Sequence, residues 1–158
     1  LVIYGQNSTA TAYVERASNA FPNSTDLAVA NLDGDSKPEI YVLGSTDNGN
    51  QTLNVFDVDL QPIRSVPLSV RATALYVEQS AFARKNLLLA VAHRTRQAYP
   101  ALSHAELWAI DPVSGTDLWR SPTLLGTVPL NSLHFFDVDA DGDGEIVLGT
   151  TYGMYHTR

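Results

Sequence analysis

The sequence predicts an all-β fold made of propeller-type blades, each a four-stranded antiparallel sheet, and three observations support this. Apolar residues gather in short runs rich in Val, Ile and Leu. Gly, Pro, Asn and Asp separate these runs at intervals of about ten residues, which is typical of strands joined by short loops. Two acidic segments of equal length recur between such runs, which indicates that the strands form repeated units.

The apolar runs predict strands along the whole chain. The expected ranges are 1–5, 27–33, 39–45, 52–60, 62–70, 73–79, 86–93, 105–112, 116–122, 132–139, 145–151 and 153–158. The best helix candidate is 78–86, and that segment could equally be a loop.

Composition limits the function classes. The chain has 158 residues, enough for one domain with a real core, and its net charge of −7 argues against nucleic acid and anionic membranes as partners. The absence of cysteine excludes disulfides, thiolate zinc sites and cysteine nucleophiles. No apolar run is long enough to insert in a membrane and no signal peptide is visible. Because the chain opens on "LVIYG" without Met, we interpret residues 1–158 as one segment of a longer extracellular, cell-surface or periplasmic protein.

The two acidic segments are "NLDGDSKPEI" at 31–40 and "DVDADGDGEI" at 137–146. An apolar run precedes each segment, and a run that ends at glycine follows it. Residues 76–92 have the same strand–loop–strand pattern without the acidic residues. The second strands of successive units then begin near residues 1, 40, 87 and 146, so each unit holds about four strands, the size of a propeller blade.

The acidic segments have the composition of calcium loops. Calcium takes six to eight oxygen ligands, and a tight loop can direct side chains one, three, five and nine to one side while the carbonyl of residue seven completes the set. The candidate ligands are Asn31, Asp33, Asp35, Lys37 and Glu39 in the first loop, and Asp137, Asp139, Asp141, Asp143 and Glu145 in the second. Lys37 would contribute its carbonyl only. A register that starts at Asp139 would place Val147, which has no side-chain oxygen, at position nine. The alternative interpretation is a pair of solvated turns, because Asp, Asn and Gly favour turns.

These loops resemble the calcium loops of FG-GAP repeats, also called VCBS repeats, in integrin-alpha-type β-propellers. The family pattern is roughly Asp-x-Asp/Asn-Gly-Asp-Gly-x-x-Asp before an apolar strand, and the loop joins the first two strands of a blade. The resemblance implies a propeller fold, bound calcium and metal roles for the residues at positions one, three, five and nine. Ser36 and Ala140 stand where the pattern has Gly, Asn31 stands where it has the leading Asp, and both loops end in Glu.

A second segment, "LWAIDPVSGTDLWRSP" at 107–122, resembles a quinoprotein-type propeller repeat. Its plain interpretation is a hairpin, in which Gly115 accepts a positive φ and Trp108 and Trp119 pack between blades. We favour that packing role because one hairpin lacks the residues that would hold a quinone. No catalytic residues are predicted: the sequence has no G-x-S-x-G motif and no histidines at metal-like spacing, and repetition of the acidic residues favours structure over acid–base catalysis.

The sequence therefore predicts a calcium-stabilised, non-catalytic module for adhesion, binding or scaffolding, with a protein or glycan ligand at one loop face. The alternative is the propeller portion of a secreted polysaccharide-degrading or quinoprotein-like enzyme. About three units are fewer than a closed ring needs. We therefore expect further blades or strands from flanking sequence or from a second copy.

Overall fold

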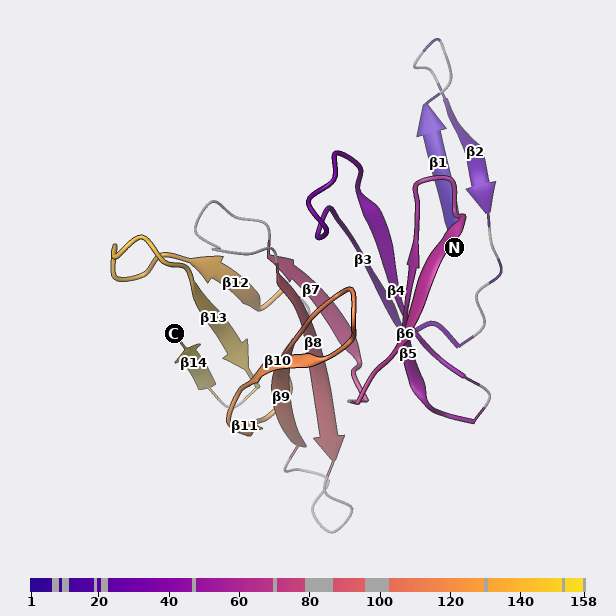
Figure 1. Cartoon of the computed structure of the whole chain (residues 1–158). Helices are drawn as coiled ribbons and strands as arrows, with labels where there is room; N and C mark the ends of the chain where they lie inside the picture. The colour runs from indigo at the N-terminus through magenta and orange to yellow at the C-terminus, as the bar shows by residue number, and fades with distance from the viewer. Residues whose placement is uncertain are drawn as a thin grey trace.

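The computed structural model describes residues 1–6, 9, 12–18, 20, 23–46, 48–69, 71–78, 87–95, 103–129, 131–151 and 153–157. These residues form strands and loops, without a helix among them. The strands are β1 (Val2–Gln6), β2 (Tyr13–Ser18), β3 (Asp26–Ala30), β4 (Glu39–Ser45), β5 (Gln51–Phe56), β6 (Pro62–Pro67), β7 (Ala74–Glu78), β8 (Leu87–Thr95), β9 (Ser103–Ile110), β10 (Asp117–Arg120), β11 (Leu124–Leu125), β12 (Leu133–Phe136), β13 (Glu145–Thr150) and β14 (Gly153–Thr157) (Figure 1).

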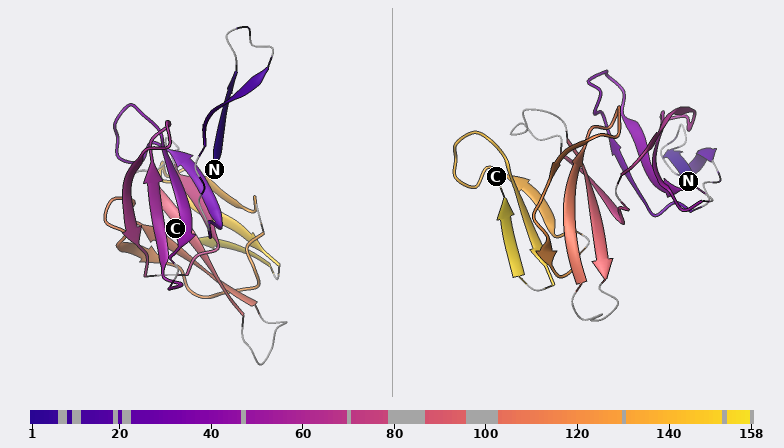
Figure 2. Two further views of the ribbon diagram at one scale, coloured as in Figure 1. Left: turned by 90° about the vertical axis from the view of Figure 1, so that its right-hand side faces the viewer. Right: turned by 60° about the horizontal axis from the view of Figure 1, so that its bottom comes forward.

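The strands form four antiparallel sheets, so the all-β prediction is confirmed. The N-terminal hairpin is β1–β2; the first sheet has the order β3-β4-β5-β6; the second has β10-β9-β8-β7 with β11 beside β9; and the third has β12-β13-β14. Neighbours in sequence are neighbours in each sheet, as expected for a chain whose strands are joined by short turns. The sheets follow one another across the molecule, with the N-terminal hairpin and the third sheet at opposite ends (Figure 2). The described strands do not close into a ring.

Several expected strand boundaries need correction: the strands expected over 27–33, 62–70 and 132–139 end at Ala30, Pro67 and Phe136. Strands β2 and β11 were not expected; β11 is only two residues long and is defined by its pairing with β9. The strand expected over 52–60 ends at Phe56, because Asp57 starts a turn in which its carboxylate accepts hydrogen bonds from the backbone N–H groups of Asp59 (2.9 Å) and Gln61 (2.8 Å). Of the helix candidate 78–86, Glu78 ends β7 and the rest lies outside the described residues.

Side chains between the sheets form three apolar cores. Along β4, Tyr41 and Leu43 enter a core shared with the second sheet, whereas Ile40 and Val42 face the N-terminal hairpin. Both faces of β4 are therefore buried, which explains why its sequence is an almost continuous apolar run. The remaining core lies between the second and third sheets and includes the fully buried Leu148.

Polar contacts and one glycine fix the first sheet against the second. The Asp26 carboxylate accepts a hydrogen bond from the backbone N–H of Leu75 (2.8 Å). Gly115 in the β9–β10 turn has a φ of 72°, as expected, and a Cβ added there would lie 2.2 Å from Cγ1 of Val66. Trp108 is buried in the core between these sheets, so its expected packing role is confirmed.

Candidate metal sites in two acidic loops

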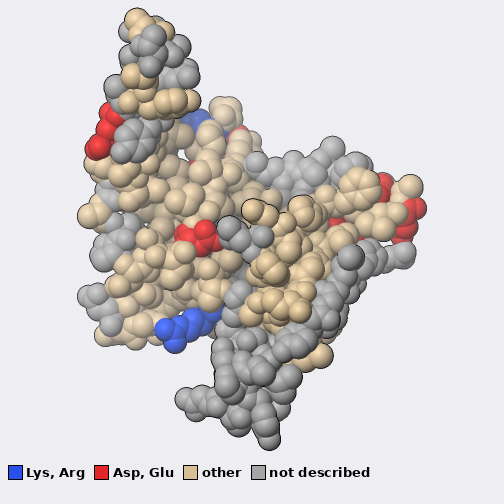
Figure 3. Space-filling view, turned by 180° about the vertical axis from the view of Figure 1, so that it is seen from behind, with Lys and Arg blue, Asp and Glu red and all other residues tan. Residues whose placement is uncertain are grey.

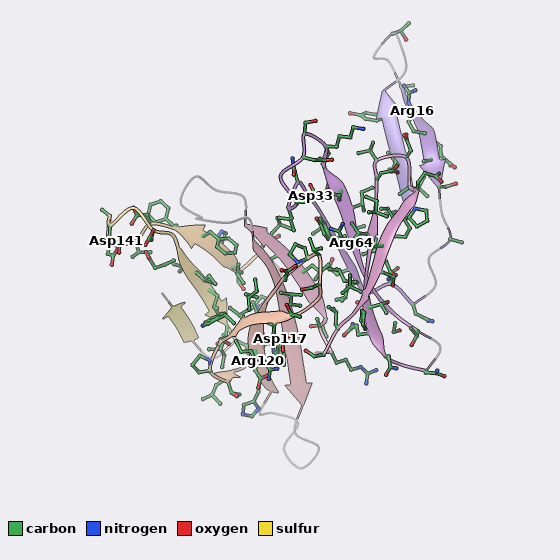
Figure 4. The ribbon with its side chains drawn as sticks, viewed as in Figure 1. Arg16, Asp33, Arg64, Asp117, Arg120 and Asp141 are labelled. Carbon is green, nitrogen blue, oxygen red and sulfur yellow. The ribbon has the colours of Figure 1, made fainter. Side chains whose placement is uncertain are left out.

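The two acidic segments form loops at corresponding places in the first and third sheets. Residues 31–38 join β3 to β4, and residues 137–144 join β12 to β13. Each loop therefore connects the first and second strands of its sheet, and the two loops lie at separate places in the molecule (Figure 4). From behind, acidic side chains gather at the extremity formed by the β12–β13 loop, where Asp139 and Asp141 are exposed (Figure 3).

A buried glutamate at the start of the second strand anchors each loop. Glu39 and Glu145 are each only 3% exposed, although each directly follows an acidic loop as the first residue of its strand. The Glu145 carboxylate accepts a hydrogen bond from the backbone N–H of Val138 (2.7 Å), and Glu39 makes the corresponding, longer contact with the N–H of Leu32 (3.4 Å). In both loops the residue at position nine is thus bonded to the backbone of position two. This contact folds the loop over the glutamate.

Three carboxylates converge in the first loop. One oxygen each of Asp33, Asp35 and Glu39 lies within 4.8 Å of the others. Backbone N–H groups orient two of them: the N–H of Asp35 bonds to Asp33 (3.0 Å), and the N–H of Lys37 bonds to Asp35 (2.6 Å). The Asn31 side chain accepts the N–H of Gly34 (3.0 Å) and donates to the carbonyl of Asp35. Lys37 itself is exposed.

Three carboxylates also converge in the second loop, but from different positions. They belong to Asp137, Asp139 and Glu145, again within 4.8 Å of one another. Asp137 accepts two backbone N–H groups, from Asp141 (3.1 Å) and from Gly142 (3.0 Å). Asp141 accepts the N–H of Asp143 (2.9 Å), as Asp35 accepts the N–H of Lys37 in the first loop, but Asp141 is not part of the group.

The structure thus brings together six of the ten predicted ligands. In the first loop these are positions three, five and nine; in the second they are one, three and nine. Asp141 and Asp143 stand apart from the group, while the amide of Asn31 is bonded within its own loop. Glu145 occupies position nine of the register that begins at Asp137, and it lies in the group.

In the first loop, the pKa values of Glu39 and Asp33 are shifted in opposite directions. Burial raises the pKa of Glu39, and the neighbouring Asp33 raises it further by hydrogen bonding and by charge. The Asp33 pKa is lowered, chiefly by the backbone N–H of Asp35, and Arg64 lowers it as well. The Tyr41 hydroxyl donates a hydrogen bond to Glu39 (3.1 Å). A cation among these oxygens would favour the ionised form of Glu39 because it offsets the nearby negative charge.

Both loops turn sharply at the same position. The residue at position four has a left-handed backbone in each, with a φ of 84° at Gly34 and 60° at Ala140. The second loop adds a left-handed Gly142 at position six, with a φ of 91°. Two loops of different sequence therefore share one local bend, and Ala140 adopts a conformation that favours glycine.

The donor set fits a hard cation. Carboxylate and carbonyl oxygens suit calcium, magnesium or manganese, whereas zinc and copper favour imidazole or thiolate, which neither group contains. Oxygens bound to calcium at about 2.3–2.6 Å lie up to about 5 Å from one another across the ion, and the spread of both groups is within that limit. The two acidic clusters could therefore hold a metal ion.

Two residues near the first loop were not predicted. Tyr41 lies two residues after Glu39 and so on the same face of β4, a relation that strand periodicity could have indicated. Arg64 comes from β6, and its Nε donates to the carbonyl of Pro112 in the second sheet (3.2 Å). Its influence on Asp33 depends on the fold and has no sequence signal.

Among the described residues, these two groups are the only clusters of three or more potential metal ligands, and neither includes a histidine. No helix in the described part of the chain has the length and apolar character for a membrane crossing. Comparisons with protein-family models, with curated proteins and with solved structures find no match for this chain.

Proposed function

We propose that this chain is a β-propeller module of the FG-GAP type, whose two acidic loops bind calcium and whose role is binding or scaffolding outside the cytoplasm. The observation that carries the proposal is the repeated arrangement. Two loops at corresponding places each gather three carboxylates, one of them from a buried glutamate, and that glutamate contacts the backbone of position two in both. A solvated acidic turn has no need of a buried glutamate.

When bound, the ion supplies positive charge that offsets the repulsion among the carboxylates. The residues of the chain determine the geometry of the site. Backbone N–H groups hold the loop carboxylates in place before binding, so little ordering remains for the ion to induce. Each loop joins the first two strands of a sheet, and a bound ion would therefore stabilise that pair of strands against separation.

Binding would be tighter at the second loop. It offers five carboxylates, whereas the first offers three and contains Lys37. Arg64 adds positive charge near Asp33 in the first loop. Affinity for calcium rises with the charge of the ligand set.

Thermal unfolding in calcium and in chelator tests metal binding. An ion present at about one hundred times its dissociation constant stabilises the native state by about 2.7 kcal/mol. For a chain of this length, that corresponds to a rise in melting temperature of roughly 5–10 °C. Equal melting temperatures in calcium and chelator at low ionic strength would contradict the proposal.

Calorimetry on matched variants tests the residues and their ranking. Asp33→Asn and Asp139→Asn each alter position three of one loop, and Asp59→Asn is a control in an acidic turn outside both groups. We expect Asp139→Asn to remove the tighter binding event, Asp33→Asn the weaker one, and Asp59→Asn neither. Loss of the tighter event in Asp33→Asn would reverse the ranking. Unchanged binding in both loop variants would show that calcium binds elsewhere.

The expected binding partner is a protein or a glycan at the loop face. We place the module outside the cell because short, exposed oxygen-rich loops suit the weak affinities of extracellular calcium modules. The Trp108 ring is buried in the core, which supports a packing role for the 107–122 hairpin over a quinone site.

A further inference from the structure

Arg64 is held between the first sheet and the β9–β10 turn of the second. Its Nε donates a hydrogen bond to the carbonyl of Pro112 in that turn (3.2 Å). Further along the same turn, a Cβ added to Gly115 would meet Cγ1 of Val66, so the turn lies along β6. Because β5 ends and β6 begins at the end of the sheet where the first acidic loop joins β3 to β4, Arg64 lies near that loop.

The register of the first sheet places Arg64 on the face that carries part of the first acidic group. Arg64 pairs with Val55, and Val55 pairs with Tyr41, so the three side chains form one row across β6, β5 and β4. Glu39 lies two residues before Tyr41 and accepts a hydrogen bond from its hydroxyl (3.1 Å). Two strand spacings, about 10 Å, separate the backbone of Arg64 from that of Tyr41. Figure 4 shows Arg64 and Asp33 at the same end of the first sheet.

The charge of Arg64 acts on carboxylates of two sheets. The side chain is only partly exposed, and its Nη2 is buried without an acceptor among the described residues. Backbone N–H groups of their own loops are the main cause of the lowered pKa values of Asp33 and Asp111, and Arg64 lowers both pKa values further. Asp33 belongs to the first acidic loop and Asp111 to the β9–β10 turn, so one guanidinium lies near an acidic residue of each.

The second acidic loop has no comparable cation in its own sheet. No Lys or Arg occurs between residues 121 and 157, a range that includes the whole third sheet and its acidic loop. The two loops therefore share their backbone bend and their buried glutamate, but only the first has an arginine on the strands of its sheet.

We propose that Arg64 is an internal counter-charge of the first acidic loop, which stabilises the loop without metal and weakens calcium binding there. This inference rests on the proposed calcium binding and names the residue that regulates it. A divalent ion and a guanidinium about 10 Å apart in water repel each other by an energy equal to about a fourfold change in the dissociation constant. A chain without this arginine would bind calcium more tightly and depend on it more for stability.

A purely structural role makes a different prediction. If Arg64 only joined the β9–β10 turn to the first sheet, its loss would lower stability equally with and without calcium. The affinity of the first loop for calcium would not change.

Calorimetry in the Asp139→Asn chain measures the first loop alone, because that change removes the expected event at the second loop. Calcium is titrated at low ionic strength. We expect Arg64→Gln to lower the dissociation constant about three- to tenfold, and Arg64→Met serves if the Gln variant does not fold. Arg64→Lys keeps the charge and should stay within about twofold of its parent. Arg71→Gln removes the same charge from an exposed position beside the β4–β5 turn, at the far end of the sheet, and should leave the affinity unchanged.

Melting curves of the same chains separate charge from structure. The difference between the melting temperatures in calcium and in chelator should widen in Arg64→Gln. It should not widen in Arg64→Lys or in Arg71→Gln. A loss of the contact with Pro112 alone would lower both melting temperatures and leave their difference unchanged.

Three results would overturn the inference. They are an unchanged or weaker affinity in Arg64→Gln, an equal gain in Arg64→Lys, and an equal gain in Arg71→Gln, which would reflect net charge alone. If no chain in the series binds calcium, the first-loop site of the proposed function is wrong together with this inference. Binding of unchanged affinity in Arg64→Gln leaves that site in place and overturns this inference alone.

Discussion

Exchange of glycine and alanine at position four of the acidic loops should shift stability in opposite directions. Ala140 has a φ of 60° and Gly34 a φ of 84°. A left-handed conformation destabilises the folded state by about 1–2 kcal/mol for an alanine, and glycine avoids this strain. Glycine, however, gives the unfolded chain more conformational entropy, which lowers stability by about 0.4–1 kcal/mol. Ala140→Gly should therefore stabilise the fold by about 0.5–1 kcal/mol. Gly34→Ala should destabilise it by a similar amount, because a Cβ there meets nothing within 4 Å and only the backbone changes.

Thermal melts of both single variants and of the double variant measure these effects in chelator. A change of this size corresponds to roughly 1–4 °C in a chain of this length. The double variant should melt close to the wild type, because the loops lie in different sheets and distant sites act additively.

Gly49 provides the control. It has a φ of 77°, nothing lies within 4 Å of its added Cβ, and it is outside both acidic loops. Gly49→Ala should therefore cost the same in calcium as in chelator. If Ala140→Gly lowered the melting temperature, or if Gly34→Ala left it unchanged, the two loops would not share the left-handed bend.

Three further changes test the fold and one turn. Gly115→Ala should lower the free energy of unfolding, measured in urea, clearly more than Gly49→Ala does. Overpacking against Val66 adds about 1–3 kcal/mol to the cost of a left-handed alanine. Equal losses in the two variants would refute the close approach of Gly115 to Val66. Leu43→Ala should cost about 2–5 kcal/mol because its side chain is 0% exposed, and a loss below 1 kcal/mol would contradict its place in the core. Asp111 has a lowered pKa because backbone N–H groups of its own turn bond to its carboxylate. Above pH 3.8, its ordinary pKa, the ionised Asp111 carboxylate therefore adds stability, and this contribution is lost as the pH falls below that value. In melts at a series of pH values, the melting-temperature advantage of the wild type over Asp111→Asn should shrink as the pH falls. A constant difference between the two melting temperatures would contradict this role of Asp111.

Local chemistry in the sequence was enough to predict most of the strands and the two acidic loops, but not β2 or β11. Alternating and continuous apolar runs reveal strands because a strand buries side chains with a period of two, and β4 is apolar throughout because both of its faces are covered. The loops were visible because their acidic residues and turn residues are contiguous. The spacing of the second strands was also correct, with β4, β8 and β13 starting at residues 39, 87 and 145.

Tertiary structure decided which of these residues meet. The ten predicted ligands are equivalent by spacing, yet the fold groups Asp35 in the first loop and leaves Asp141 out of the group in the second, although each accepts the backbone N–H of position seven. The charge of Arg64 reaches Asp33 from another strand of the sheet, and no local pattern could show it. Likewise, Leu27 has the same place in its strand as Leu133, and only the arrangement of sheets leaves the first exposed and the second buried. Burial depends on which neighbour covers a face, and that neighbour is remote in sequence.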